Sequence, residues 1–217
     1  MYYKTSDQER IKLGFHKHEC NNGVHFCGLY ENEQERDEII LGYLRQGIIC
    51  NDRVLYTPTE RSVEDFYQKF SEKYPDDLSL LHENPNLTIN TADDLYYENG
   101  NFSPLRMNKN LGKFYEAAQK DKKVNIRTTA EMIWVLDKNL DKTKHMAYES
   151  LLNYFIPGKS WISICMYNIN RFDGKTIMQV LQTHPYTISK GCMITKNPYY
   201  IHPDVWLAEN APEYIIK

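Results

Sequence analysis

Short apolar runs alternate with amphipathic stretches along the whole chain, and this alternation constrains the fold more than any other feature. Residues 161–167, Trp-Ile-Ser-Ile-Cys-Met-Tyr, form the clearest run, and Val24–Leu29 and Arg53–Tyr56 are shorter ones. Near-continuous apolar runs of this length are typical of strands buried on both faces of a sheet. Strands that alternate with helices predict an α/β fold, with a mostly parallel central sheet and helices on both faces.

Capping residues predict where several helices begin and end. Asn32, with Glu35 three residues later, has the spacing of a capping box. Ser62 is the expected N-cap of a second helix, and Ser103-Pro104 is a helix start with serine as the cap and proline at the first helical position. Gly47 is the expected stop of the first helix.

The remaining elements complete the expected sheet. Leu87–Ile89 and Val124–Thr128 are predicted strands, Lys144–Phe155 is a predicted helix, and Tyr186–Ile188 with Cys192–Ile194 is a predicted C-terminal β-hairpin. Ligands of such sheets bind beyond the carboxyl ends of the strands. We therefore expect the site near the loops that follow Cys27, Tyr56, Thr128 and Tyr167.

Charge and composition exclude several classes of protein. Lys and Arg total 26 and Asp and Glu total 29, so the net charge is −3. Without a basic block, this balance argues against direct DNA binding. No run reaches the roughly 18 apolar residues of a membrane span, and residues 1–10 lack the apolar core of a signal peptide. Five cysteines, an odd number, then favour reduced thiols and a cytoplasmic location.

Histidine and cysteine are concentrated near the N-terminus, where His16, His18, Cys20, His25 and Cys27 lie within 12 positions. Imidazole and thiolate suit a transition metal such as zinc or iron, although this spacing matches no standard zinc finger. His25 and Cys27 share one face of an extended strand. If residues 16–20 are extended as well, His16, His18 and Cys20 also share one face. The alternative is that Cys27 is a core residue and the first three are incidental. The remaining cysteines, Cys50, Cys165 and Cys192, are interpreted as background.

Two segments, Gly158-Lys159-Ser160 and Gly174-Lys175-Thr176, match the tail of a phosphate-binding P-loop. The full motif also needs a glycine five residues before the glycine that precedes the lysine. Those positions hold Asn153 and Ile169, and residues 28–32 after the first strand contain no Gly-Lys-Ser/Thr. The sequence therefore argues against ATP hydrolysis.

Other polar residues could belong to a site. Arg127, Glu131 and Trp134 lie around the end of the fourth predicted strand, and Glu131 and Trp134 would share a helical face if that segment is helical. An Arg–Glu pair beside an indole could bind a small polar ligand or be a structural ion pair. Glu149 needs a partner if it is buried among its apolar neighbours. His184, after a helix, is interpreted as a structural hydrogen-bonding residue.

Taken together, these blocks resemble a known family. Gly23-x-His25-x-Cys27-x-x-Tyr30 is similar to the signature of the MEDS domain, the methanogen/methylotroph sensory domain of dichloromethane-responsive regulators. Later blocks keep the family's order: Arg53-Val54-Leu55-Tyr56, Tyr96-x4-Asn101-Phe102, Arg127-x3-Glu131-Met132-x-Trp134, Tyr148-Glu149-x3-Asn153, Cys165-x-Tyr167-x3-Arg171-Phe172, Thr183-His184-Pro185 and Asn197-Pro198-Tyr199-Tyr200.

The resemblance implies a RecA-like, three-layer core without a working P-loop. It covers residues 20–205 as a sensory domain, with 1–19 as an N-terminal extension and 206–217 as a C-terminal tail. The family's proposed role is to sense simple hydrocarbon derivatives such as alcohols and methylated or halogenated one-carbon compounds. The ligand-binding positions that it implies are His25, Cys27, Tyr30, Arg127, Glu131 and Trp134.

The leading hypothesis is a non-catalytic, small-molecule signalling domain. With no room for a fused DNA-binding or kinase module, we expect it to act through a separate signalling or transcriptional partner, without DNA or membrane contact. Such a sheet is also compatible with a homodimer. One alternative is an enzyme that uses a Cys27 thiolate or a bound metal in methyl- or alkyl-group chemistry. A second alternative is a degenerate nucleotide-binding module that docks other proteins.

Overall fold

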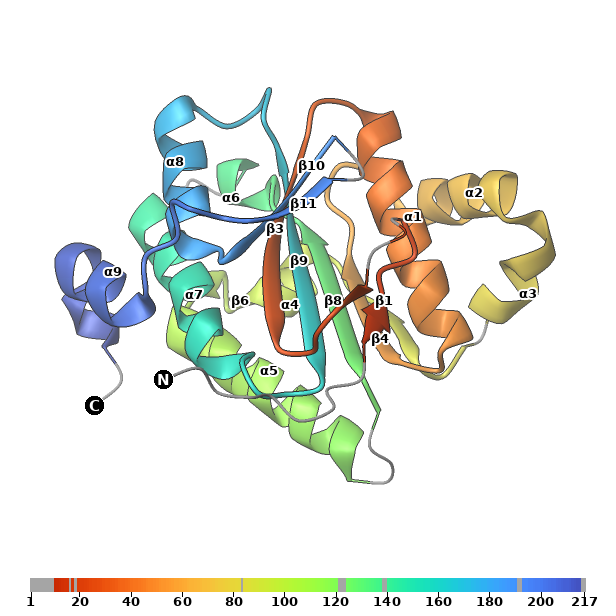
Figure 1. Cartoon of the computed structure of the whole chain (residues 1–217), viewed down its shortest axis with the longest axis horizontal. Helices are drawn as coiled ribbons and strands as arrows, with labels where there is room; N and C mark the ends of the chain where they lie inside the picture. Colours follow the sequence, from red (N-terminus) through yellow and green to blue (C-terminus); the bar gives the residue numbers. More distant parts are fainter. Residues whose placement is uncertain are drawn as a thin grey trace.

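The computed structural model describes residues 10–15, 17, 19–82, 84–120, 124–137, 140–190 and 193–215. Within these ranges the central sheet has seven strands (Figure 1). Their order is β11 (Met193–Lys196), β10 (Tyr186–Ser189), β3 (Val24–Tyr30), β9 (Trp161–Asn168), β8 (Ile126–Glu131), β4 (Arg53–Thr57) and β5 (Leu87–Ile89). All neighbours pair in parallel except β10 and β11, which form an antiparallel hairpin.

Helices cover both faces of this sheet, which gives three layers (Figure 1). One face carries α1 (Glu33–Ile49), α2 (Val63–Lys73), the 3-10 turn Pro75–Asp77 and α3 (Leu78–Leu81). The other carries α5 (Pro104–Gln119), α7 (Lys142–Phe155), α8 (Gly174–Thr183) and α9 (Pro203–Asn210). Short elements complete the described chain: β1 (Ile11–Lys12), β2 (Glu19–Cys20), α4 (Ala92–Tyr96), β6 (Tyr97–Glu98), β7 (Asn101–Phe102), α6 (Trp134–Asp137) and the 3-10 turn Pro212–Tyr214.

The two faces of the sheet differ in chemistry because successive residues of a strand point to opposite sides. Phe26 of β3 and Ile164 of β9 belong to an apolar cluster with α1. Their neighbours His25 and Cys165 point to the other face, where α7 packs. The strand pattern thus places polar, chemically active side chains in a buried layer between sheet and helices.

Most of the expected architecture is confirmed: the mostly parallel sheet, the helices on both faces and the C-terminal hairpin. Asn32, Ser62 and Ser103 cap α1, α2 and α5 by accepting backbone N–H groups. The expected stop at Gly47 is wrong, since α1 continues to Ile49. A Cβ at Gly47 would lie 2.7 Å from the Cδ of Arg127, so this glycine lets α1 pack closely against Arg127 of β8.

Segments on both sides of residues 20–205 contribute to the core. Ile11 and Leu13 are buried in the cluster that contains α1, and β1 pairs with β2. Trp206 and Leu207 of α9 are buried in the cluster that contains α7. In the ranges given above, no helix combines the length and apolarity that a membrane crossing requires.

Candidate functional site

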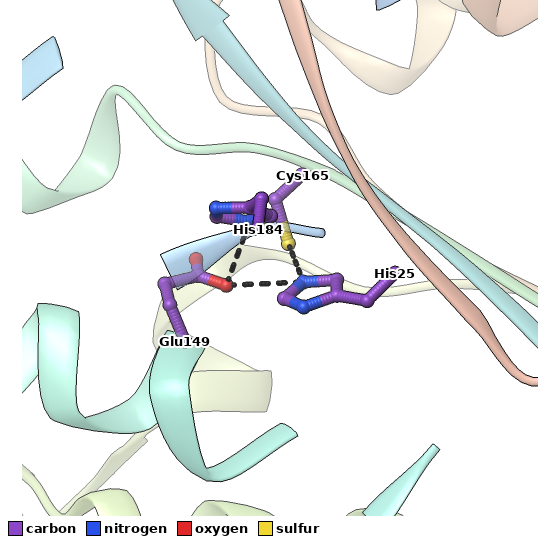
Figure 2. Close-up of side chains that lie close together, drawn as sticks. All are labelled: His25, Glu149, Cys165 and His184. Atoms are coloured by element: carbon purple, nitrogen blue, oxygen red, sulfur yellow. Dashed lines mark hydrogen bonds and ion pairs between the residues drawn. The ribbon is translucent and has the colours of Figure 1, made fainter. Parts of the chain in front are cut away.

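Four buried side chains from four different elements converge on the α7 face of the sheet. They are His25 of β3, Glu149 of α7, Cys165 of β9 and His184, which directly follows α8 (Figure 2). Their ligand-type atoms all lie within 4.8 Å of one another. Each of these residues is at most 4% exposed.

Three contacts define the centre of this cluster (Figure 2). The Nε2 atom of His25 lies 3.3 Å from Glu149 Oε2 and 3.5 Å from Cys165 Sγ. The Nε2 atom of His184 also lies 3.3 Å from Glu149 Oε2. Two imidazoles and a thiol are therefore arranged around a single carboxylate oxygen.

The local fold explains why these residues meet. On the paired strands β3 and β9, Cys27 is opposite Cys165 and His25 is opposite Ser163, so Cys165 is a diagonal neighbour of His25 on the same face. Glu149 is in the middle of α7, which packs on this face. His184 is held where α8 ends and the chain turns into β10.

Surrounding groups fix the orientation of the cluster. The Nδ1 atom of His25 lies 3.2 Å from Asn153 Oδ1. The Nδ1 atom of His184 lies 2.7 Å from the Val180 carbonyl oxygen. The other carboxylate oxygen of Glu149, Oε1, accepts a hydrogen bond from the Tyr167 hydroxyl at 2.7 Å. This oxygen also lies 3.2 Å from Nε2 of His145.

Burial and neighbouring groups set the charges in the cluster. Burial opposes the charge on Glu149, but the rings of His184, His145 and His25 together hold the pKa of this carboxyl well below its usual value. Burial, followed by the nearby His184, lowers the pKa of His25. Burial, reinforced by Glu149, raises the pKa of the Cys165 thiol. At neutral pH the protein's own groups thus favour a Glu149 carboxylate, a neutral His25 and a Cys165 thiol.

A small cavity lies beside Cys165, and it offers about 20 Å³ to the centres of water-sized molecules. A cavity needs roughly 10–15 Å³ by this measure to hold one water. The hydroxyl of Thr57, a lining residue, has no hydrogen-bond partner within the described part of the chain. The lining comprises Leu55, Thr57, Leu95, Tyr96, Met107, Leu111, Thr128, Thr129, Ala130, Tyr148, Ser163 and Cys165.

The structure brings only one of the sequence-predicted site residues, His25, into the cluster. Cys27 is on the same face, but its thiol donates towards the Tyr186 carbonyl and the Thr187 hydroxyl at 3.7 and 3.6 Å. Tyr30 is on the opposite face, and its hydroxyl donates to Glu60 Oε2 at 2.9 Å.

Arg127 and Glu131 do not form the ion pair that the sequence suggested. Both residues belong to β8, which runs from Ile126 to Glu131 instead of over 124–128. Four residues of extended chain separate them by about 13 Å. Arg127 donates through Nε to Asp52 Oδ2 at 2.5 Å. Glu131 instead accepts hydrogen bonds from the Tyr56 hydroxyl at 2.8 Å and from the backbone N–H groups of residues 59 and 60. Both residues are thus engaged in separate structural networks.

Trp134 begins α6, so it does not share a helical face with Glu131 as the sequence suggested. Its indole stacks on Tyr96, with ring centroids 4.2 Å apart, and meets the edge of the His145 ring at 6.1 Å. Trp134 therefore lies in an aromatic cluster that borders Glu149 through His145.

Of the N-terminal part of the predicted metal cluster, only Cys20 lies among the described residues. His16 and His18 lie outside the described residues. Cys20 is half-buried in β2 opposite Ile11, and burial raises the pKa of its thiol to about 11.

Sequence reasoning missed the parts of the cluster that are distant in the chain. Cys165 was interpreted as background and His184 as a structural hydrogen-bonding residue. Glu149 was recognised only as a carboxylate in need of a partner. The available signal was that Glu149 lies in a predicted core helix, Cys165 in a predicted buried strand and His184 directly after a predicted helix. The cluster lies on the face of the sheet, not beyond the carboxyl ends where a ligand was expected.

The environment of Cys27 does not support its use as a nucleophile. A catalytic thiolate requires a lowered pKa, from a helix N-terminus or a positive neighbour. Burial instead raises the pKa of Cys27 to about 12, and the side chain is fully inaccessible. Cys27 is within β3, three residues before its end. This position favours the neutral thiol.

The loop between β3 and α1 is where a P-loop protein holds phosphate. Here the backbone N–H groups are used by the chain itself, since Glu31 donates to Glu35 Oε2 at 2.9 Å and Glu35 donates to Asn32 Oδ1 at 3.0 Å. Glu31, Glu33 and Glu60 also line a cleft of about 430 Å³ beyond the strand ends. Arg36 and Arg171 line the same cleft, so it carries charges of both signs.

The fold is that of a RecA-like α/β protein. Similar solved structures include the flagellar accessory protein FlaH from Methanocaldococcus jannaschii, with a TM-score of 0.54, 14% identity, and coverage of 84% of this chain and 80% of that one. A KaiC-like protein from Pyrococcus horikoshii OT3 gives a TM-score of 0.56, 11% identity, and coverage of 84% and 81%. No curated protein matches the chain.

Within this class, the chain belongs to the MEDS family, the methanogen/methylotroph, DcmR sensory domain, whose model matches residues 24–185. The resemblance inferred from the sequence blocks is thereby confirmed. Membership supports a sensory or signalling role in general.

Proposed function

We propose that the chain is a non-catalytic sensory domain for a molecule of two or three heavy atoms, such as a one-carbon alcohol, methyl compound or halomethane. The observation that carries this proposal is the cavity beside Cys165. Its volume of about 20 Å³ exceeds the roughly 10–15 Å³ needed for one water but is far below that of a drug-sized pocket, which restricts the ligand to the smallest organic molecules.

The lining of the cavity fits a weakly polar guest. Leu55, Met107 and Leu111 provide apolar contact, while the partnerless hydroxyl of Thr57 offers a hydrogen bond to an alcohol oxygen. Small-molecule sites commonly combine an apolar wall with a few polar groups that orient the ligand. None of the six ligand-binding positions predicted from sequence lines this cavity, but His25 contacts its Cys165 wall.

Ligand size limits the affinity. At a ceiling of about −1.5 kcal/mol per heavy atom, a two-atom ligand such as methanol reaches about −3 kcal/mol and a Kd of about 6 mM. A three-atom ligand such as dichloromethane reaches about −4.5 kcal/mol and a Kd of about 0.5 mM. Titrations must therefore extend into the millimolar range.

The experiment is thermal unfolding of the full chain with methanol or dichloromethane. At a twentyfold excess over Kd, a ligand that binds only the folded state stabilises it by about 1.8 kcal/mol, or about 4–7 °C in Tm. Ala130→Val adds two methyl groups to the cavity wall and is expected to abolish this response. Thr195→Val, on the exposed edge strand β11, is the control and should respond like the unmodified chain.

The comparison between variants separates specific binding from general solvent effects, which act equally on all three proteins. A melting curve of each variant without ligand establishes that it folds. If Ala130→Val responds like the control to every compound, the cavity is not the binding site. In the proposal, ligand occupancy alters a surface that a separate signalling or transcriptional partner protein recognises.

A further inference from the structure

We propose that His25, Glu149, Cys165 and His184 together bind one divalent transition-metal ion, with Zn²⁺ as the preferred metal. This inference goes beyond the proposed sensory function and does not depend on it. Metal content is measured directly, whereas ligand sensing is measured as a shift in Tm, so either proposal can fail alone.

The distances match the edges of a zinc coordination tetrahedron. Metal–nitrogen and metal–oxygen bonds of about 2.0–2.1 Å and a metal–sulfur bond of about 2.3 Å give edges of about 3.3 Å between N or O atoms and about 3.6 Å between N and S. The corresponding contacts are 3.3 Å for each imidazole with Glu149 Oε2, and 3.5 Å for His25 Nε2 with Cys165 Sγ. The other pairs lie within 4.8 Å, so small side-chain movements complete the tetrahedron.

Both imidazoles present a lone pair to the centre. The Val180 carbonyl oxygen can only accept, so His184 donates its Nδ1–H to it at 2.7 Å and Nε2 is left unprotonated in the neutral ring. Asn153 donates its own N–H groups to the carbonyls of Glu149 and Thr183. Its oxygen must therefore face His25 Nδ1 and accept a hydrogen bond from the Nδ1–H group. Metal-binding histidines are held in this way by an acceptor at the second ring nitrogen.

The carboxylate has one oxygen engaged and one directed at the centre. Oε1 of Glu149 accepts from Tyr167, and Oε2 makes no hydrogen bond within the described residues. Nε2 of His184, 3.3 Å from Oε2, makes none either. With no proton or cation between them, two acceptor atoms that face each other in a buried site are unfavourable, because each has lost its water. A cation between them converts this repulsion into coordination.

The donor set indicates the class of metal. Two imidazoles, a thiolate and a carboxylate are ligands of zinc and of similar divalent transition metals, whereas Mg²⁺ and Ca²⁺ prefer oxygen ligands alone. When the metal binds, the Cys165 thiol releases its proton to solvent. The two negative charges of Glu149 and Cys165 then balance the divalent cation, so the buried site carries no net charge. The competing explanation is a proton on one histidine, which requires no metal.

The test compares two equivalent cysteine substitutions in the full chain. Cys165→Ser removes the proposed sulfur ligand. Cys27→Ser is the matched control, since Cys27 is the buried register partner of Cys165 on the adjacent strand and its thiol is directed towards Thr187. Each protein is stripped with a chelator, titrated with Zn²⁺ or Co²⁺, and analysed for bound metal by elemental analysis and native mass spectrometry.

We expect one equivalent of metal in the unmodified chain and in Cys27→Ser, and a loss of affinity of at least a hundredfold in Cys165→Ser. The Co²⁺ form should show the intense visible bands of tetrahedral cobalt and a near-ultraviolet thiolate-to-cobalt band. Cys165→Ser should lose the thiolate band. Tyr167→Phe keeps all four ligands but removes the hydrogen bond to Glu149, and is expected to weaken binding by about 10- to 100-fold.

Circular dichroism of every variant checks the fold before metal is added. If Cys165→Ser does not fold, the metal affinity of Tyr167→Phe is the test of the proposal. The proposal is overturned if the unmodified chain, refolded in the presence of Zn²⁺ or Co²⁺, takes up neither metal, or if Cys165→Ser retains the thiolate-to-cobalt band. It is also overturned if Cys27→Ser alone loses the metal.

Discussion

Replacement of Arg127 by methionine is expected to destabilise the fold, because it removes the guanidinium from a buried ion pair with Asp52. Arg127 and Asp52 have side chains that are 1% and 3% exposed, and they are joined by a contact of 2.5 Å between Nε and Oδ2. The guanidinium also donates to the Lys12 carbonyl at 2.9 Å and lies over the Tyr43 ring. Methionine keeps most of the side-chain volume and removes the charge.

The chain contains a matched pair that differs mainly in burial. Arg45 and Asp77 are joined by the same two atoms at the same 2.5 Å, and Arg45 lies over the ring of Tyr74. Their side chains are 37% and 21% exposed. Breaking a buried ion pair by removal of one partner typically costs about 3–5 kcal/mol. Exposed pairs contribute about 0.2–1 kcal/mol. The difference in burial alone predicts a several-fold difference in cost.

Urea unfolding of Arg127→Met, Arg45→Met and the unmodified chain measures both costs. Arg127→Met should lose about 3–5 kcal/mol, equivalent to about 6–20 °C in Tm for a chain of this size, and Arg45→Met no more than about 1 kcal/mol. The double variant Arg127→Met with Asp52→Asn should cost less than the sum of its single changes, because Asp52→Asn removes the carboxylate that has lost its ion pair with Arg127. Equal losses for Arg127→Met and Arg45→Met would refute the argument from burial.

Three further predictions concern packing, capping and access. Ser103→Ala removes the N-cap of α5 and should lower the unfolding free energy by about 1 kcal/mol in urea. Gly47→Ala should cost about 1–3 kcal/mol by the same measurement, since its Cβ would press on Arg127; an unchanged midpoint would show that α1 can shift freely. Cys27, which is fully buried, should resist iodoacetamide in the folded protein while the exposed Cys50 reacts; equal labelling by peptide mass spectrometry would contradict this burial.

The strands and most helix starts could be predicted because their signals are local. The apolar run over residues 161–167 and the cap at Ser103 each depend on neighbouring residues only. Gly47 shows the limit of such signals, because glycine is a common helix stop, but here it makes room for Arg127 from β8. The reason lies in packing between elements, which no local pattern contains.

The site was less predictable for the same reason. His25 and Cys165 are 140 positions apart, and they meet because β3 and β9 are neighbours in the sheet. The dense run of histidine and cysteine near the N-terminus instead predicts a metal site among residues that are close in sequence. Glu131 could not be assigned correctly because its role depends on where β8 ends. As the last residue of β8, it faces away from α7. If a helix had begun there instead, Glu131 would share a face with Trp134.

The depth of the four-residue cluster has a kinetic consequence. Because His25, Glu149, Cys165 and His184 are almost inaccessible, nothing can reach them unless part of the α7–α8 layer opens transiently. The rates of uptake and release are then limited by the frequency of that opening and not by diffusion. A species captured during folding would be retained for the lifetime of the closed layer. Occupancy of such a centre would record past exposure and would lag behind rapid changes in the surrounding concentration.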